Sequence, residues 1–122
     1  MGCGTGSNTR LLAELVSSPE NVFGMEYSKA RLEIFKKNNP AILCKYGDLV
    51  KQIPFEEKFY AITAFAVLMH MKTAEELKRA LMNIYNSLES GGYFLWYDPN
   101  SYDHFSRGGV TTVMERDFQL SK

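Results

Sequence analysis

The longest apolar run in the chain, FYAITAFAVL at residues 59–68, does most to limit the folds that this sequence can adopt. Such a run is typical of a strand buried on both faces, which is the usual situation in a parallel sheet. A well-marked helix follows it, because Thr73 and Glu76 form a capping box and apolar residues then recur at helical spacing. Gly91 and Gly92 are expected to end that helix.

Strand-like and helix-like segments alternate through the rest of the chain. A first helix follows the N-terminal glycines and stops at Pro19, a second begins at Ser28, and a last short helix is expected from Thr112. This alternation predicts an α/β fold with a mostly parallel sheet covered on both faces. Ligands of such sheets bind beyond the carboxyl ends of the strands, so a site is expected there. The strand-like runs are residues 21–26, 41–46, 59–68 and 93–97.

A glycine-rich loop, GCGTG at residues 2–6, stands directly before the first helix. Gly2, Gly4 and Gly6 allow the backbone to turn sharply and allow a ligand to approach without a side chain in the way. The first turn of the helix adds unpaired amides and a partial positive charge. The loop alone is a weak signal, since a tight turn that binds nothing would use the same residues.

Acidic residues at the ends of the next two strands favour a nucleoside-type ligand. Glu26 lies twenty residues after Gly6, where a carboxylate can accept hydrogen bonds from both hydroxyls of a ribose. Asp48 could accept from the exocyclic amine of adenine, with the amide of Leu49 facing a ring nitrogen, and Tyr27 could lie against the adenine face. The simpler interpretations are a solvated acid, a turn-forming aspartate and a packing tyrosine.

Four stretches of the chain, read together, are more specific than the loop: GCGTGSNTRLL, VFGMEYSKARL, YGDLVKQIPF followed by FYAITAFAVLMHM, and LKRALMNIYNSLESGGYFLWYD. As a set they resemble the class I S-adenosylmethionine-dependent methyltransferases, in order and in spacing, almost to Asp98. The resemblance implies a Rossmann-like three-layer fold, S-adenosylmethionine as cofactor, and methyl transfer to an unspecified small-molecule acceptor.

The family pattern also implies where the cofactor would lie. The glycine loop would wrap its methionine part, and Glu26 would hold its ribose. Asp48 with Leu49 would hold the adenine, and the stretch around Phe65 would line the pocket between cofactor and acceptor. The cofactor-binding residues predicted in this way are Gly2, Cys3, Gly4, Gly6, Glu26, Tyr27, Asp48, Leu49 and Phe65.

The sequence identifies no general base clearly. His70, after the long strand, is a weak candidate, and a partly buried structural histidine is the simpler interpretation. Asp98 and His104 lie past the last strand, where acceptor contacts often arise, but each also suits a turn or the surface. No spacing of cysteine, histidine or acidic residues predicts a metal site.

Two other classes of protein compete with the methyltransferase. An NAD-dependent oxidoreductase carries G-x-G-x-x-G, whose third glycine would fall where Ser7 stands. A non-catalytic nucleoside-binding or assembly module derived from the same fold is the other alternative.

Members of the family have a strand with an acidic end before the glycine loop and antiparallel strands that close the sheet, and neither is expected in these 122 residues. The chain is therefore expected to be a single partial domain over residues 1–122, truncated at both ends and inactive alone. The sheet edges left exposed could pair with a second copy.

Composition excludes some partners. With 14 basic and 14 acidic residues the formal net charge is zero, which disfavours a nucleic-acid partner. Cys3 and Cys44 suit neither a disulfide framework nor a metal site and are expected to be reduced thiols of a cytoplasmic protein. No apolar run approaches the roughly 20 residues of a membrane helix, so no membrane partner is expected.

Overall fold

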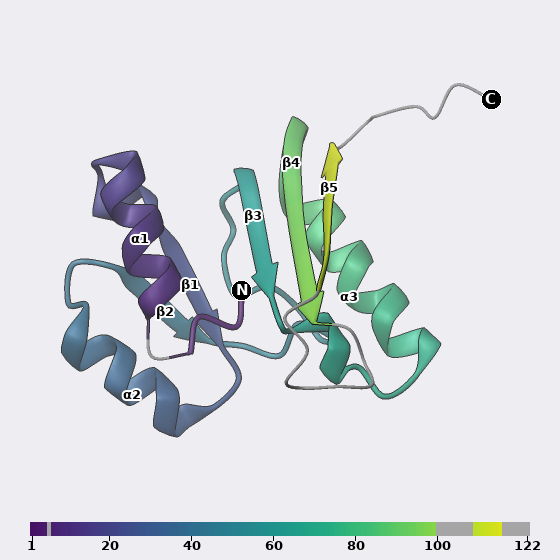
Figure 1. Ribbon diagram of the computed structural model, residues 1–122, viewed down its shortest axis with the longest axis horizontal. Helices are drawn as coiled ribbons and strands as arrows, with labels where there is room; N and C mark the ends of the chain where they lie inside the picture. The colour runs from purple at the N-terminus through teal and green to yellow at the C-terminus, as the bar shows by residue number, and fades with distance from the viewer. Residues whose placement is uncertain (5, 100–108, 116–122) are drawn as a thin grey trace. The chain divides into compact units, whose positions relative to one another are not determined.

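The computed structural model describes residues 1–4, 6–99 and 109–115, and the chain divides into two compact units, Met1–Asp48 and Leu49–Lys122. The first unit contains α1 (Ser7–Val16), the 3₁₀ turn η1 (Pro19–Asn21), β1 (Phe23–Glu26), α2 (Lys29–Asn38) and β2 (Leu43–Tyr46) (Figure 1). The second contains β3 (Phe59–Phe65), the 3₁₀ turn η2 (Leu68–His70), α3 (Ala74–Ser87), β4 (Leu88–Pro99) and β5 (Gly109–Glu115).

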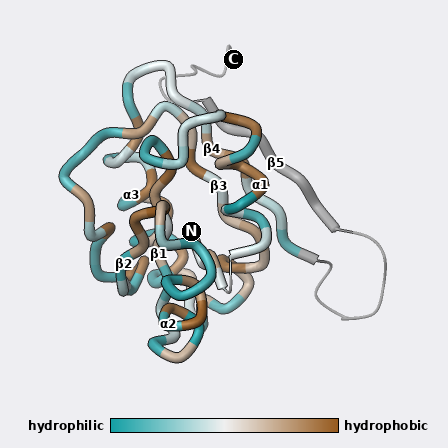
Figure 2. Tube along the Cα trace, turned by 90° about the vertical axis from the view of Figure 1, so that its left-hand side faces the viewer, coloured by the Kyte–Doolittle hydropathy of each residue, from teal (hydrophilic) through white to brown (hydrophobic). Residues whose placement is uncertain are grey.

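The first unit is built on a two-stranded parallel sheet. β1 pairs with β2 in a register that runs from Phe23 opposite Leu43 to Glu26 opposite Tyr46. Apolar and polar stretches alternate along α2 (Figure 2), as expected of a helix that buries one face. The core joins residues from α1, α2, β2 and the segments beside them, namely Ala13, Val22, Leu32, Phe35, Ile42 and Cys44, with Cys3 and Leu12 packed against them.

Local signals define the ends of α2. The Ser28 side chain accepts a hydrogen bond from the Arg31 amide at 3.4 Å, which confirms the predicted N-cap. At the other end Asn39 is buried, and both its backbone N–H and its side-chain Nδ2 donate to the Phe35 carbonyl, at 2.8 and 3.2 Å. The helix therefore ends at its C-cap residue Asn39, whose backbone and side-chain amides are both hydrogen-bonded, and it does not end at a glycine.

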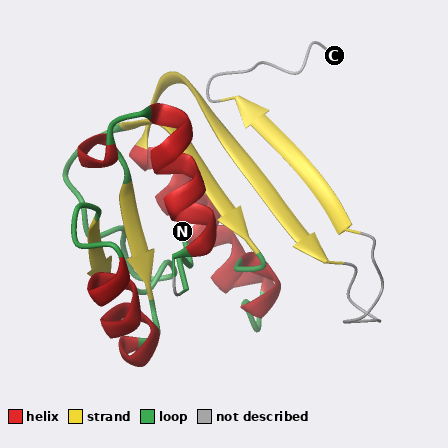
Figure 3. Cartoon of the chain, turned by 60° about the vertical axis from the view of Figure 1, so that its left-hand side comes forward, coloured by secondary structure: helices red, strands yellow, loops and turns green. Residues whose placement is uncertain are grey.

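The second unit is built on a three-stranded sheet in the order β3-β4-β5. β3 and β4 are parallel, and β4 and β5 run in opposite directions (Figure 3). Thr73 caps α3 as predicted, since its Oγ1 accepts from the Glu76 amide at 3.1 Å, while Glu76 accepts from the amide of Lys72. Among the residues of this unit that the structure describes, the buried apolar ones are Leu49, Ile62, Ala64, Leu68, Ala80, Ile84, Leu88 and Phe94.

The prediction of a short helix from Thr112 is wrong, because residues 109–115 form β5. Four β-branched residues in a row, at 110–113, favour an extended chain, and β4 offers an edge along which they pair. The local capping pattern of a threonine followed by a glutamate is outweighed by these two effects. The described chain thus includes one antiparallel strand that the sequence did not predict.

Gly91 and Gly92 do not end α3. The helix stops at Ser87, and Leu88 already has extended backbone angles at the start of β4. Gly91 keeps a positive φ of 75°, but inside the strand. A Cβ on Gly92 would lie 2.9 Å from the carbonyl oxygens of Glu89 and Tyr60, so this glycine permits a close approach of backbones.

The long apolar run forms a shorter strand than predicted. β3 ends at Phe65, and Ala66 takes a left-handed φ of 54° before η2 begins at Leu68. The Ala66 amide donates to the carbonyl of Tyr97 on β4 at 2.7 Å, which holds the bend in place. A non-glycine residue in this conformation is strained by about 1–3 kcal/mol, and such strain often occurs beside functional sites.

Candidate functional site

The glycine loop depends on left-handed backbone angles. Gly2, Gly4 and Gly6 have φ values of 60°, 55° and 107°, and the Gly6 amide donates to the Cys3 carbonyl at 3.0 Å to close the turn. Gly6 then serves as the N-cap residue of α1, without a side-chain cap. The loop therefore needs glycines for its backbone shape, and the first turn of α1 is left without a side-chain acceptor from its N-cap residue.

Two backbone hydrogen bonds bring the loop and the end of β2 to the end of β1. The Cys3 amide donates to the Met25 carbonyl at 3.0 Å, and the Gly47 amide donates to the Glu26 carbonyl at 3.1 Å. Consecutive carbonyls of a strand point to opposite sides, so β1 has the glycine loop along one edge and β2 along the other. The predicted residues of the first unit converge in this way on the carboxyl end of one strand.

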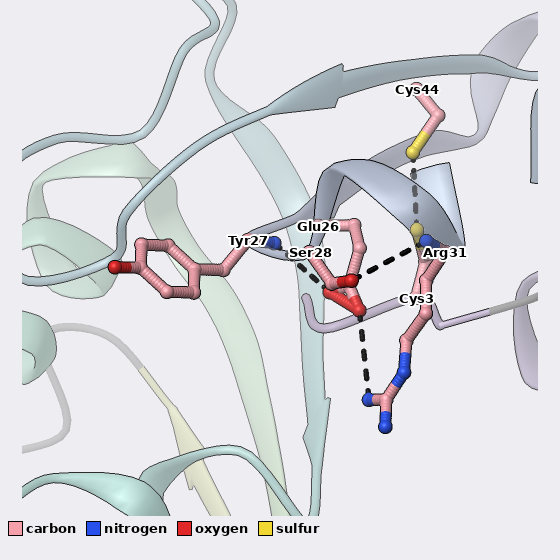
Figure 4. A network of polar contacts seen from close by, with 6 residues as sticks. All are labelled: Cys3, Glu26, Tyr27, Ser28, Arg31 and Cys44. Carbon is pink, nitrogen blue, oxygen red and sulfur yellow. Dashed lines mark hydrogen bonds and ion pairs between the residues drawn. The ribbon is translucent and has the colours of Figure 1, made fainter. Parts of the chain in front are cut away.

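Glu26 is the buried acid of this convergence, with 5% of its surface exposed. Its Oε2 accepts the Tyr27 amide at 2.9 Å, and its Oε1 lies 3.9 Å from Nη1 of Arg31, whose side chain is 67% exposed (Figure 4). An ion pair at that distance with an exposed partner contributes little. The carboxylate is thus fixed by one short bond and keeps capacity for further donors.

Aromatic rings flank the ends of β1 and β2. Tyr27 is exposed, and its ring stacks on that of Tyr46 with centroids 5.9 Å apart at 26°. The Lys29 ammonium lies 5.4 Å from the centroid of the Tyr46 ring. Asp48, two residues past Tyr46, is half-buried at the end of the first unit. The site residues predicted from the sequence in this unit are Gly2, Cys3, Gly4, Gly6, Glu26, Tyr27 and Asp48.

Cys3 and Cys44, for which the sequence predicted no contact, lie side by side. Sγ of Cys3, in the loop, lies 3.0 Å from Sγ of Cys44, on β2 (Figure 4). The hydrogen bond between the two thiols lowers the pKa of Cys3, and the same bond with burial raises the pKa of Cys44. Forty-one positions separate them, and they meet because the loop and β2 both pair with β1.

Three predicted residues belong to the second unit. Leu49 is buried, and its carbonyl accepts from Nδ2 of Asn83 at 2.7 Å. Phe65 is half-buried at the end of β3, with its ring centroid 6.3 Å from that of Tyr97. His70 is exposed at the end of η2, so the expectation of a partly buried histidine is wrong.

Asp98, near the end of β4, has a more specific environment than the sequence indicated. Its Oδ2 accepts from the indole Nε1 of Trp96 at 2.5 Å, and its buried Oδ1 has no hydrogen-bond partner among the described residues. An acidic residue at a strand end was the available signal, but burial of one oxygen could not be read from it. His104 lies outside the described residues.

The glycine loop, the parallel strand pair and the acid at a strand end define a Rossmann-like α/β domain that suits a nucleoside-containing ligand. A family described as "Methyltransferase domain" matches residues 1–96 of the chain. The chain belongs to this methyltransferase family.

Known relatives agree with that assignment. A tRNA N(3)-methylcytidine methyltransferase of Drosophila melanogaster is 29% identical over 111 residues, covering 84% of this chain and 34% of the relative. A dTDP-4-amino-2,3,4,6-tetradeoxy-D-glucose N,N-dimethyltransferase of Saccharopolyspora spinosa is 30% identical over 122 residues, covering 95% of this chain and 47% of the relative. The chain thus spans a third to a half of the curated relatives it matches.

A solved structure shares the fold. The amino pentose methyltransferase CalS10 from Micromonospora echinaspora, with S-adenosylmethionine bound, superposes with a TM-score of 0.74 at 22% identity, over 93% of this chain and 52% of that one. Over residues 1–4, 6–99 and 109–115, no helix is long and apolar enough to cross a membrane. Within the same ranges no group of three histidine, cysteine or acidic residues could hold a metal ion.

Proposed function

We propose that this chain is the cofactor-binding part of an S-adenosylmethionine-dependent methyltransferase. The observation that carries the proposal is the convergence at the end of β1, where the Met25 carbonyl holds the glycine loop and the Glu26 carbonyl holds Gly47. This arrangement offers a glycine-rich loop and a buried carboxylate at the end of β1, with a second acid just past β2, which is what a sulfonium nucleoside needs.

In this proposal Glu26 accepts hydrogen bonds from the two ribose hydroxyls. The carboxylate is already oriented by the Tyr27 amide, so little reorganisation accompanies binding. The weak contact with Arg31 leaves Oε1 available at small cost, since the two groups are 3.9 Å apart. The methionine part lies against Gly2, Gly4 and the first amides of α1.

The adenine is proposed to lie beyond β2. Asp48 accepts from its exocyclic amine, the Leu49 amide faces a ring nitrogen, and Tyr27 covers one face of the ring. The stacking of Tyr27 on Tyr46 supports this, because both rings are exposed and present flat aromatic surface next to Gly47. Phe65 is proposed to line the side toward the acceptor.

The cofactor supplies the activated methyl group, and the residues of this chain bind and orient it. Positioning of an acceptor atom in line with the transferred methyl is mainly an effect of proximity. His70 is exposed and could take the proton of a hydroxyl or amine acceptor, so it remains the candidate base.

A small-molecule acceptor is proposed over a tRNA. The S. spinosa relative acts by name on an amino sugar nucleotide and CalS10 on an amino pentose, whereas the Drosophila relative acts on tRNA. A formal net charge of zero favours the first kind, because tRNA binding relies on many phosphate contacts. Pairing of the sheet edges with a second copy and a cytoplasmic location stay predictions.

Isothermal titration with S-adenosylhomocysteine tests the proposed cofactor contact. Glu26→Ala should weaken binding by about 1.5–3 kcal/mol for each charge-assisted bond lost, which is roughly ten- to 150-fold per bond. Glu33→Ala is the matched control, since Glu33 is an exposed acid on α2, and it should leave the affinity unchanged. Equal affinities of Glu26→Ala and the unmodified chain would remove Glu26 from the site.

A methyl-transfer assay separates the enzyme from a non-catalytic nucleoside-binding module. A methyltransferase should transfer labelled methyl groups to an amino sugar or to tRNA, when binding is seen. Transfer to either acceptor would exclude the non-catalytic binding module.

A further inference from the structure

Cys3 belongs to the glycine loop that is predicted to hold the cofactor, and its contact with Cys44 has chemistry of its own. The two sulfurs are 3.0 Å apart, and each belongs to a different element, the glycine loop and β2. Gly24 on β1 leaves the room for them, because a Cβ there would lie 2.9 Å from Sγ of Cys44 and 3.4 Å from Sγ of Cys3. A residue larger than Gly24 would therefore clash with the Cys44 thiol.

We propose that Cys3 and Cys44 form a redox-active dithiol, which a low-molecular-weight disulfide such as glutathione disulfide converts into a reversible intramolecular disulfide. The bond needs the sulfurs to approach from 3.0 Å to about 2.05 Å, a movement of about 1 Å. A shift of that size is available to a glycine-flanked residue, since Gly2 and Gly4 adjoin Cys3.

The surroundings give the two thiols different roles. Cys3 is half-buried, so it is the thiol that an external disulfide can reach. The hydrogen bond between the two thiols lowers the pKa of Cys3, which favours its reaction as the thiolate. Cys44 is buried, and its raised pKa keeps it protonated until Cys3 has reacted. Cys3 is thus the attacking thiol and Cys44 the resolving thiol.

The reaction balances in two exchange steps. The Cys3 thiolate attacks one sulfur of glutathione disulfide, whose S–S bond breaks and releases one glutathione thiolate. Cys44 then loses its proton to the released thiolate and attacks Sγ of Cys3, which releases the second glutathione. Two protein thiols are oxidised by two electrons, and one glutathione disulfide is reduced to two thiols. The first released glutathione takes the proton of Cys44, and the second takes from solvent the proton that Cys3 gave up when it formed its thiolate.

Oxidation would tie the glycine loop covalently to β2. The bond would close a loop of some forty residues in the unfolded chain, since 41 positions separate the two cysteines. Closure of a loop of this length reduces the entropy of the unfolded state and raises the melting temperature of the oxidised form.

Incubation of the full chain with defined ratios of reduced and oxidised glutathione tests the proposal. The unmodified protein should lose both free thiols, lose about 2 Da and gain several degrees in melting temperature, all reversed by dithiothreitol. Peptide mapping without reduction should recover Cys3 linked to Cys44 within a monomer. Retention of both thiols, a stable glutathione adduct on Cys3, or a bond between two chains would each overturn the proposal.

Two variants keep the roles separable. Cys44→Ala should stop at the glutathione adduct on Cys3, because the resolving thiol is missing. Cys3→Ala should react at least tenfold more slowly, because Cys44 is buried. Equal reaction rates of Cys3→Ala and the unmodified chain would show that Cys44 is the attacking thiol and would contradict the assignment. Circular dichroism of each variant establishes that it is folded.

Discussion

Alanine substitutions at Gly4 and Gly6 should differ sharply in their effect on stability, although both sites have positive φ. A Cβ on Gly6 would lie 2.5 Å from Nδ2 of Asn39 and 2.9 Å from the Phe35 ring, and a Cβ on Gly4 would meet nothing within 4 Å. Phe35 has 0% exposure and Asn39 has 6%, so neither side chain can move into solvent. Gly6→Ala therefore combines backbone strain with overpacking.

The magnitudes follow from these two contributions. A strained φ costs about 1–3 kcal/mol, and forcing extra volume into a packed site costs about 1–3 kcal/mol more, so Gly6→Ala should cost roughly 2–6 kcal/mol. Displacement of Asn39 from the Phe35 carbonyl would add to this loss. Gly4→Ala should cost only the left-handed conformation, about 1–2 kcal/mol.

Urea denaturation followed by circular dichroism measures both changes, with the two variants as controls for each other. The unfolding midpoint of Gly6→Ala should fall well below that of Gly4→Ala at an unchanged slope. Titration with S-adenosylhomocysteine adds a second reading, since Gly4→Ala should stay folded yet bind more weakly if a ligand approaches the loop at Gly4. Equal midpoints for the two variants would refute the packing argument at Gly6.

The remaining predictions concern two polar contacts, Trp96 with Asp98 and Cys3 with Cys44. Trp96→Phe should lower the free energy of unfolding by about 1.5–3 kcal/mol, because it leaves the Asp98 carboxylate without its hydrogen-bond donor. In an Asp98→Asn background the same substitution should cost only about 1 kcal/mol. Equal losses in the two backgrounds would show that the two side chains are not coupled. The rate of alkylation of Cys3 by iodoacetamide should level off at a lower pH than for a free cysteine, because a lowered pKa increases the thiolate fraction at neutral pH. Cys44→Ala should move the midpoint of this pH profile upward. An unmoved midpoint would mean that the hydrogen bond with Cys44 does not lower the pKa of Cys3.

Local sequence signals predicted the parts of the fold that depend on a single side chain and a single hydrogen bond close to it in the chain. The caps at Ser28 and Thr73 could be placed from sequence because each hydroxyl accepts from an amide three residues ahead, at Arg31 and Glu76. The helix expected from Thr112 was wrong, because pairing along β4 is a long-range effect that a capping pattern does not contain. Strand ends depend on such partners more than helix starts do.

The two sheets differ from the single sheet that alternation alone predicts. The described strands form a two-stranded and a three-stranded sheet, with parallel pairs β1-β2 and β3-β4 and the antiparallel pair β4-β5. The parallel pairs were predictable from the alternation of strands and helices. The bend at Ala66 was not, because an alanine gives no signal for a left-handed conformation.

The candidate site was predictable where spacing along the chain decides it. Glu26 lies at the end of β1, as its distance from the glycine loop suggested, and it is buried. The contact of Cys3 with Cys44 was not predictable, because it depends on the hydrogen bond from the Cys3 amide to the Met25 carbonyl and on the pairing of β2 with β1. The same holds for the unpartnered oxygen of Asp98, since burial of single atoms follows from packing.

Together, the glycine loop, Glu26 and Asp48 are proposed to bind the methionine part, the ribose and the adenine of S-adenosylmethionine. Calorimetric titration of the chain with S-adenosylhomocysteine and, separately, with NADH tests this most directly. We expect saturable binding of S-adenosylhomocysteine and no heat of binding from NADH. Binding of NADH without binding of S-adenosylhomocysteine would contradict it and would favour a dinucleotide-dependent enzyme.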